Sequence, residues 1–144
     1  MVNVYPYFAY AADPADVRLE YAQFTATSPV VQDRNLSYYS LFDAMVDAFL
    51  WAMEGVGAAV VDAVVAESGW PSSGNGNFAS PDLAATYNKN FKAHLESNKG
   101  TPKRPGTSID GFIFAMFNED QKPGGVEQNF GLFYPNMNPV YPIF

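Results

Sequence analysis

The sequence predicts an α/β fold in which parallel strands alternate with helices, as in part of a (β/α)8 barrel. Short apolar or aromatic runs typical of buried strands occupy residues 2–8, 62–67 and 111–117. Between them, residues 41–54 and 80–97 carry apolar side chains at helical spacing. The order gives two complete strand–helix units and a closing strand, which we place in one domain of residues 1–144.

The first strand is predicted from β-branched and aromatic residues, with Pro6 near the point where it leaves the sheet. The N-terminus lacks the basic region of a signal peptide. A chain that begins within a strand indicates a piece of a longer protein. Residues 9–40 follow as a long connection with turn signals, and its aromatic residues favour an ordered segment: Tyr21, Phe24, Tyr38 and Tyr39.

Both helices carry recognisable start signals. Ser40 is a candidate N-cap with Asp43 in the capping-box position, and Ser80 precedes Pro81 in the same way. The first helix should end at Gly55 and Gly57, and the second near a cap at Gly100. We expect the acidic residues of the first helix to face solvent: Asp43, Asp47 and Glu54.

Composition excludes several function classes. The net charge is −7, which argues against a nucleic-acid or anionic-membrane partner. No stretch approaches 18 apolar residues, so no membrane span is predicted. The chain has no cysteine and one histidine, His94, inside a predicted helix, where a structural or surface role is expected. No metal site and no cofactor are therefore predicted.

Aromatic residues make up 16% of the chain, including 12 Phe and 9 Tyr. Such rings either fill a core or line a groove that stacks sugars, and the sequence leaves both interpretations open. The candidate sugar-contacting residues end a predicted strand or follow one. They are Tyr5, Tyr7, Phe8, Trp70 and Phe117, and the glycine and serine residues around Trp70 favour an exposed platform there.

Two glutamates stand at predicted strand ends, Glu67 and Glu119. The carboxyl ends of strands are where the chemistry of βα folds collects, and paired carboxylates suit glycosidic bond cleavage. A salt-bridged structural glutamate is the alternative. Asn118 is placed to bond a carboxylate or a sugar hydroxyl, and Lys122 and Glu127 lie in the next loop, where a solvated position is equally compatible.

Six segments together resemble glycoside hydrolase family 17, the plant endo-β-1,3-glucanases. The most specific are Glu67-Ser68-Gly69-Trp70-Pro71 and Phe114-Ala115-Met116-Phe117-Asn118-Glu119, and the others are residues 2–8, 41–48, 100–106 and 129–133. The resemblance implies a (β/α)8 TIM barrel, of which this chain holds the C-terminal portion, from the sixth to the eighth strand. It also implies a secreted (extracellular or cell-wall) or vacuolar location. Asn35-Leu36-Ser37 is an N-glycosylation sequon, a pattern that often occurs by chance.

The resemblance implies that Glu67 is the nucleophile of a retaining reaction on β-1,3-glucan, with Glu119, Lys122 and Glu127 in supporting roles. The family's acid/base glutamate follows the fourth strand and is absent from this chain, and the flanks of Glu119 match the eighth strand instead. We therefore expect the isolated chain to be weak or inactive. A partner is then either a complementary N-terminal fragment or a second copy. The alternatives are a non-catalytic glucan-binding or structural fragment, and a hydrolase of another β-glucan.

Overall fold

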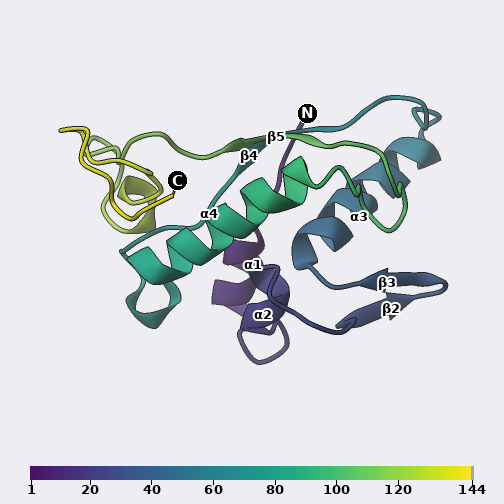
Figure 1. Cartoon of the computed structure of the whole chain (residues 1–144), viewed down its shortest axis with the longest axis horizontal. Coiled ribbons are helices and arrows are strands. Elements are labelled where there is room, and N and C mark those ends of the chain that lie inside the picture. The colour runs from purple at the N-terminus through teal and green to yellow at the C-terminus, as the bar shows by residue number, and fades with distance from the viewer. Residues whose placement is uncertain (144) are drawn as a thin grey trace.

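A parallel three-stranded sheet lies along one side of the molecule, and the helices pack below it (Figure 1). The computed structural model describes residues 1–143, and the strands β1 (Val2–Asn3), β4 (Val64–Ser68) and β5 (Asp110–Ile113) lie in the order β1-β4-β5. Asn3 pairs with Glu67, and Val65 pairs with Gly111. The predicted alternation of parallel strands and helices is confirmed, although β1 and β5 are shorter than expected (Figure 1).

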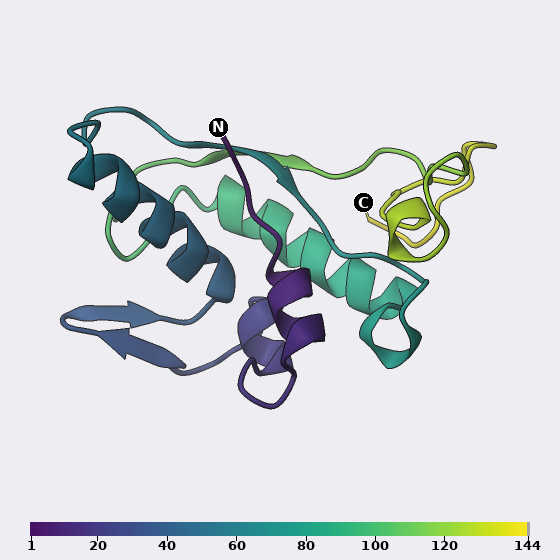
Figure 2. The same cartoon turned by 180° about the vertical axis from the view of Figure 1, so that it is seen from behind.

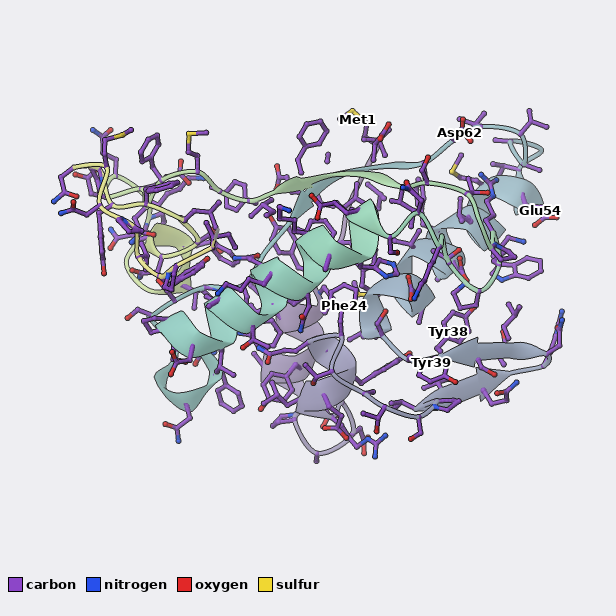
Figure 3. The ribbon with its side chains drawn as sticks, in the orientation of Figure 1. Met1, Phe24, Tyr38, Tyr39, Glu54 and Asp62 are labelled. Atoms are coloured by element: carbon purple, nitrogen blue, oxygen red, sulfur yellow. The ribbon has the colours of Figure 1, made fainter. Side chains whose placement is uncertain are left out.

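Two long helices pack along the sheet, α3 (Leu41–Gly55) and α4 (Pro81–Glu96). Both predicted caps are confirmed, because the Ser40 hydroxyl accepts the Asp43 amide and the Ser80 hydroxyl accepts the Leu83 amide, each at 3.2 Å. Figure 3 shows Phe24 between these helices. The buried core joins both helices to the strands through Val4, Phe42, Val46, Leu50, Val65, Tyr87 and Phe91.

The N-terminal prediction is wrong beyond Asn3. Helix α1 (Pro6–Ala12) follows β1 almost at once, with Pro6 in its first turn. Proline suits that position because its fixed φ is helical and its missing N–H would have no partner there. Local strand propensity in Tyr5, Tyr7 and Phe8 was therefore overridden by the proline.

The connection over residues 9–40 is ordered, as predicted, but it is not a plain loop. It contains α2 (Leu19–Ala22) and an antiparallel hairpin of β2 (Val31–Asp33) and β3 (Leu36–Tyr38). Arg34 takes a left-handed φ of 53° in the two-residue turn. Figure 2 shows this hairpin and the C-terminal tail at opposite ends of the molecule.

Two acidic residues of α3 are buried, contrary to the prediction. Asp47 accepts hydrogen bonds from the Tyr38 hydroxyl at 3.0 Å and the Lys103 amide at 2.8 Å. Burial raises the pKa of Asp47. Asp43 accepts from the Ser40 hydroxyl, and its Oδ1 lies 2.9 Å from His94 Nε2 on α4. Helical periodicity missed these positions because their partners come from distant segments.

The connections after each long helix and strand also differ in detail. The cap of α4 is Ser97 and not Gly100, and both Asn98 and Gly100 have a left-handed φ, of 53° and 70°. Strand β5 ends at Ile113 rather than 117, and short 3₁₀-helices follow β4 and β5: η1 (Gly76–Phe78) and η2 (Val126–Gln128). Tyr141 and Ile143 of the tail are buried, and Phe144 lies outside the described residues.

Over residues 1–143, no helix combines the length and apolar composition that crossing a bilayer requires. The same described residues contain no cluster of His, Asp and Glu side chains arranged to hold a metal ion.

Candidate functional site

An open pocket of about 230 Å³ lies where the carboxyl ends of β1 and β4 meet the segment after β5. Ligand sites of parallel sheets collect at this edge, because the loops that follow the strands converge there. The pocket combines two carboxylates, one lysine and four aromatic rings. Its lining residues are Tyr5, Phe8, Glu67, Phe114, Lys122, Glu127 and Phe130.

Glu67 is held from both sides of its strand. Its carbonyl accepts the Val4 amide at 2.9 Å, and the next carbonyl, of Ser68, accepts the Phe114 amide at 2.8 Å. The backbone of β4 is thus fixed by both neighbouring segments. Glu67 itself is only partly buried, so its carboxylate reaches the pocket from a rigid strand.

Tyr5 contacts the Glu67 carboxylate directly. Its hydroxyl donates a hydrogen bond to Glu67 Oε2 at 2.8 Å. Burial raises the pKa of Tyr5, and the hydrogen bond to Glu67 and the negative charges of Glu67 and Glu127 raise it further. Tyr5 is therefore a phenol at neutral pH, which donates a proton to the hydrogen bond and orients the carboxylate.

The loop after β5 brings two charged side chains to the pocket. Lys122 and Glu127 both line the pocket with Glu67. Glu119 is not among the lining residues; its Oε2 lies 3.8 Å from Lys122 Nζ, and both side chains are close to half exposed. Such an exposed ion pair contributes little to stability. The structure thus brings together three of the four predicted charged residues and leaves Glu119 outside the pocket lining.

Side-chain hydrogen bonds to the backbone and one contact between aromatic rings fix the position of this loop. The Gln128 side chain donates to the carbonyls of Asp120 and Lys122, at 3.1 and 2.8 Å. Asn118 Oδ1 accepts the Gly131 amide at 2.8 Å, and Phe117 packs against Phe133 with a centroid distance of 6.3 Å. Asn118 and Phe117 therefore fasten the loop and do not line the pocket, where the sequence placed them.

The aromatic wall differs from the predicted one. Tyr5 makes edge contacts with Phe8, Phe114 and Phe130, at centroid distances of 5.5, 6.2 and 5.8 Å. Phe114 and Phe130 were not predicted as site residues. A signal existed for Phe114, because in an extended chain it alternates with Gly111, which packs toward Phe91 and Leu95 of α4.

Trp70 and Tyr7 belong to the core instead of the pocket. Both are fully buried, and Trp70 Nε1 donates to the Phe78 carbonyl at 3.0 Å. The Tyr7 hydroxyl accepts from Asn75 Nδ2 at 3.0 Å. Because the rings of Tyr7, Tyr10 and Tyr87 contact the buried indole, Trp70 offers no free face to a sugar ring, and the predicted platform is wrong.

Comparisons with known proteins point to one family. The model for glycosyl hydrolases family 17 matches residues 1–143. A probable glucan endo-1,3-beta-glucosidase of Arabidopsis thaliana, BG4, is 59% identical over 145 aligned residues, which span 100% of this chain and 42% of that protein.

Two sets of solved structures share the fold closely. One describes plant beta-glucan endohydrolases with distinct substrate specificities, at a TM-score of 0.91 and 51% identity, covering 98% of this chain and 45% of that one. The other is CJP38, a beta-1,3-glucanase and allergen of Cryptomeria japonica pollen, at 0.91 and 54%, covering 98% and 43%. The chain thus spans less than half the length of the proteins it matches.

Proposed function

The chain belongs to glycosyl hydrolase family 17 and forms part of a (β/α)8 barrel, and on this premise we propose that it serves the hydrolysis of internal β-1,3-glucosidic bonds in β-glucans. One observation carries the proposal. Glu67 lies with Tyr5, Lys122 and Glu127 in an open, aromatic-walled pocket at the carboxyl edge of the sheet. Aromatic faces bind the C–H faces of sugars, and carboxylates perform the chemistry of glycosidic bonds.

We assign Glu67 the role of nucleophile. Its Oε2 accepts from Tyr5, and over the described residues Oε1 has no hydrogen-bond partner. The free oxygen forms a bond to the anomeric carbon while the bond from that carbon to the leaving oxygen breaks. The leaving oxygen takes a proton from a general acid as it departs. Water then attacks the glycosyl-enzyme and returns a proton to that group, which restores the Glu67 carboxylate and retains the anomeric configuration.

Lys122, Glu127 and Glu119 support this step in the proposal. The Lys122 cation lines the pocket with the Glu67 and Glu127 carboxylates and offsets their repulsion, and Glu119 Oε2 lies 3.8 Å from the lysine Nζ, outside the pocket lining. None of these residues is assigned the proton transfer to the leaving oxygen. General acid–base catalysis contributes about 10²–10⁴-fold, so this chain alone should be weak or inactive.

The missing acid is expected on the remaining strands of the barrel. We assign β1, β4 and β5 to the sixth, seventh and eighth barrel strands, which makes the chain the C-terminal portion. Strands β1 and β5 are the two edges of the sheet, and an unpaired edge pairs readily with another strand. Met1, Phe112 and Met116 are exposed beside these edges. The expected partner is a complementary barrel segment, with a second copy of the chain as the alternative.

The location proposed for this activity is outside the cell or in the vacuole. Asn35 of the sequon is exposed in the β2–β3 turn, where its side-chain amide is accessible to a glycosyltransferase. Production in a secreting eukaryotic host tests this, because a glycan removable by an amidase should appear on Asn35 and be absent from Asn35→Gln.

Release of reducing ends from laminarin tests the proposed reaction. We would compare the chain alone, the chain mixed with the N-terminal barrel segment of a relative, and the same mixture with Glu67→Gln. Activity should appear or rise in the mixture and vanish with the substitution. Full activity in the Glu67→Gln mixture would contradict the proposal.

A non-catalytic glucan-binding role is the second candidate, since this chain lacks the acid. It predicts laminarin binding by the chain without release of reducing ends in the mixture. Comparing laminarin with cellulose and mixed-linkage glucan in both assays then defines the linkage preference.

A further inference from the structure

A second pocket, of about 240 Å³, lies between the turn of the β2–β3 hairpin and helix α3. It shares no residue with the Glu67 pocket, and the hairpin projects from the end of the molecule opposite the C-terminal loops (Figure 2). One side is the turn and the other is α3 with the loop after α4. The lining residues are Asp33, Arg34, Asn35, Leu36, Trp51 and Lys103.

Trp51 provides an exposed aromatic surface in this pocket. It is 43% exposed, whereas the other tryptophan, Trp70, is fully buried. Lys103 Nζ stands 3.1 Å from the centre of the indole and forms an ion pair with Glu54. The Lys103 amide is also bonded to the buried Asp47 carboxylate at 2.8 Å. The indole is therefore held in place by a lysine that is itself anchored in the core.

The turn supplies polar groups that the fold does not use. Over the described residues, the side chains of Asp33, Arg34 and Asn35 make no hydrogen bond or ion pair, and all three are exposed. Together they present a carboxylate, a guanidinium and an amide beside the indole. The net charge here is zero, because the negative charges of Asp33 and Glu54 equal in number the positive charges of Arg34 and Lys103. This arrangement suits a neutral ligand with many hydroxyl groups.

We propose that this pocket is a second carbohydrate site, which binds a β-linked glucose chain away from the Glu67 pocket. Lys103 covers one face of the indole, and the exposed part of the ring would contact the apolar face of a glucose unit while Asp33 and Arg34 bond its hydroxyls. The choice of β-glucan as ligand rests on the proposed function. A second contact on the same polymer would lengthen the time that the protein stays bound to its substrate, because binding at one site raises the effective concentration of the polymer at the other.

The experiment uses the chain from a bacterial host, which leaves Asn35 unmodified. Electrophoretic retardation in gels containing laminarin reports binding of the wild type and of Trp51→Ala, Asp33→Ala, Phe8→Ala and Tyr39→Ala. Tyr39 is a matched control, since it is 48% exposed and lines neither pocket. We expect Trp51→Ala to weaken retardation roughly tenfold, Asp33→Ala to weaken it less, and Tyr39→Ala to leave it unchanged.

Tryptophan emission gives an independent readout. Acrylamide should quench Trp51 and spare the buried Trp70, and laminaripentaose should protect Trp51 in the wild type and protect it less in Asp33→Ala. Unchanged retardation in Trp51→Ala together with weakened retardation in Phe8→Ala would overturn the second site and leave the proposed function standing. The reverse pattern would support the second site and contradict glucan binding at Glu67. Binding by none of the proteins would overturn both.

Discussion

Two tyrosine–carboxylate pairs in this molecule have nearly the same geometry and different surroundings. Tyr5 donates to Glu67 at 2.8 Å, and Tyr38 donates to Asp47 at 3.0 Å. Asp47 is sealed in the core, where the Lys103 amide is a second donor, whereas Glu67 opens onto a pocket with a lysine and another carboxylate. The comparison teaches that the hydrogen bond does not distinguish a structural carboxylate from a chemical one. Access of the carboxylate to a ligand does.

The largest expected difference between the pairs is in catalysis. In any preparation that hydrolyses laminarin, Glu67→Gln should lower the rate by at least about 10³-fold, because no other group takes the place of the nucleophile. The free energy of unfolding should change by less than about 0.5 kcal/mol, since the side chain lies in an open pocket. Reducing-end assays and denaturant unfolding measure the two quantities. A large loss of stability would show that Glu67 has a structural role, as Asp47 does.

Asp47→Ala should give the opposite result. It leaves the Tyr38 hydroxyl and the Lys103 amide without their acceptor, and should cost about 2–3 kcal/mol in the free energy of unfolding. Binding of laminarin at the Glu67 pocket should be unaffected under conditions where the chain is folded. Asp33→Ala, at an exposed aspartate, is the control for stability. Equal unfolding midpoints for both variants would show that the buried pair has no structural role.

Removing the hydroxyl groups compares the two donors directly. Tyr5→Phe should slow formation of the glycosyl-enzyme by about 10–100-fold, since a hydrogen bond to a charged group contributes about 1.5–3 kcal/mol. Tyr38→Phe should lower stability instead and leave this rate unchanged. Stopped-flow kinetics with an activated glycoside measure the rate of glycosyl-enzyme formation, and thermal unfolding measures the stability of each variant. The same effect on rate and stability in both variants would contradict the assignment of a catalytic role to Tyr5 and a structural role to Tyr38.

The smallest effect concerns pH. Burial raises the pKa of Asp47 in the folded protein above its ordinary value of 3.8. The stability that this group contributes is present below pH 3.8 and is lost as the pH rises through the folded pKa. Relative to Asp47→Asn, the wild type should therefore lose free energy of unfolding as the pH rises from 3.8 through the folded pKa. Above the folded pKa, the free energies of unfolding of the two proteins should change with pH in the same way. Chemical unfolding at several pH values measures the slope, and a difference of the opposite sign would rule out burial as the cause.

Local signals predicted the parts of the fold that depend on local chemistry. The Ser40 and Ser80 caps and the parallel order of strands and helices follow from neighbours in sequence. The position of Glu67 at a strand end was also accessible, because an apolar run that ends in a carboxylate is a local pattern.

The missed features depend on contacts between distant segments. Asp47 looked solvent-facing because its donors come from the hairpin and from the loop after α4. Trp70 looked exposed because its glycine-rich loop gave no sign of folding back through η1. Phe130 entered the pocket wall only through the path of the last loop. Burial of a polar or aromatic side chain is thus set by the tertiary structure, which local patterns do not contain.

Covalent trapping tests the central claim, that Glu67 is a nucleophile open to the pocket, most directly. A 2-deoxy-2-fluoro β-1,3-glucobioside with a dinitrophenyl leaving group needs no general acid, so the test does not depend on where the acid lies. Peptide mass spectrometry should find one glycosyl group on Glu67, and none after Glu67→Gln. Labelling of Glu119 or Glu127 instead, or no labelling of a chain that binds laminarin, would contradict the account.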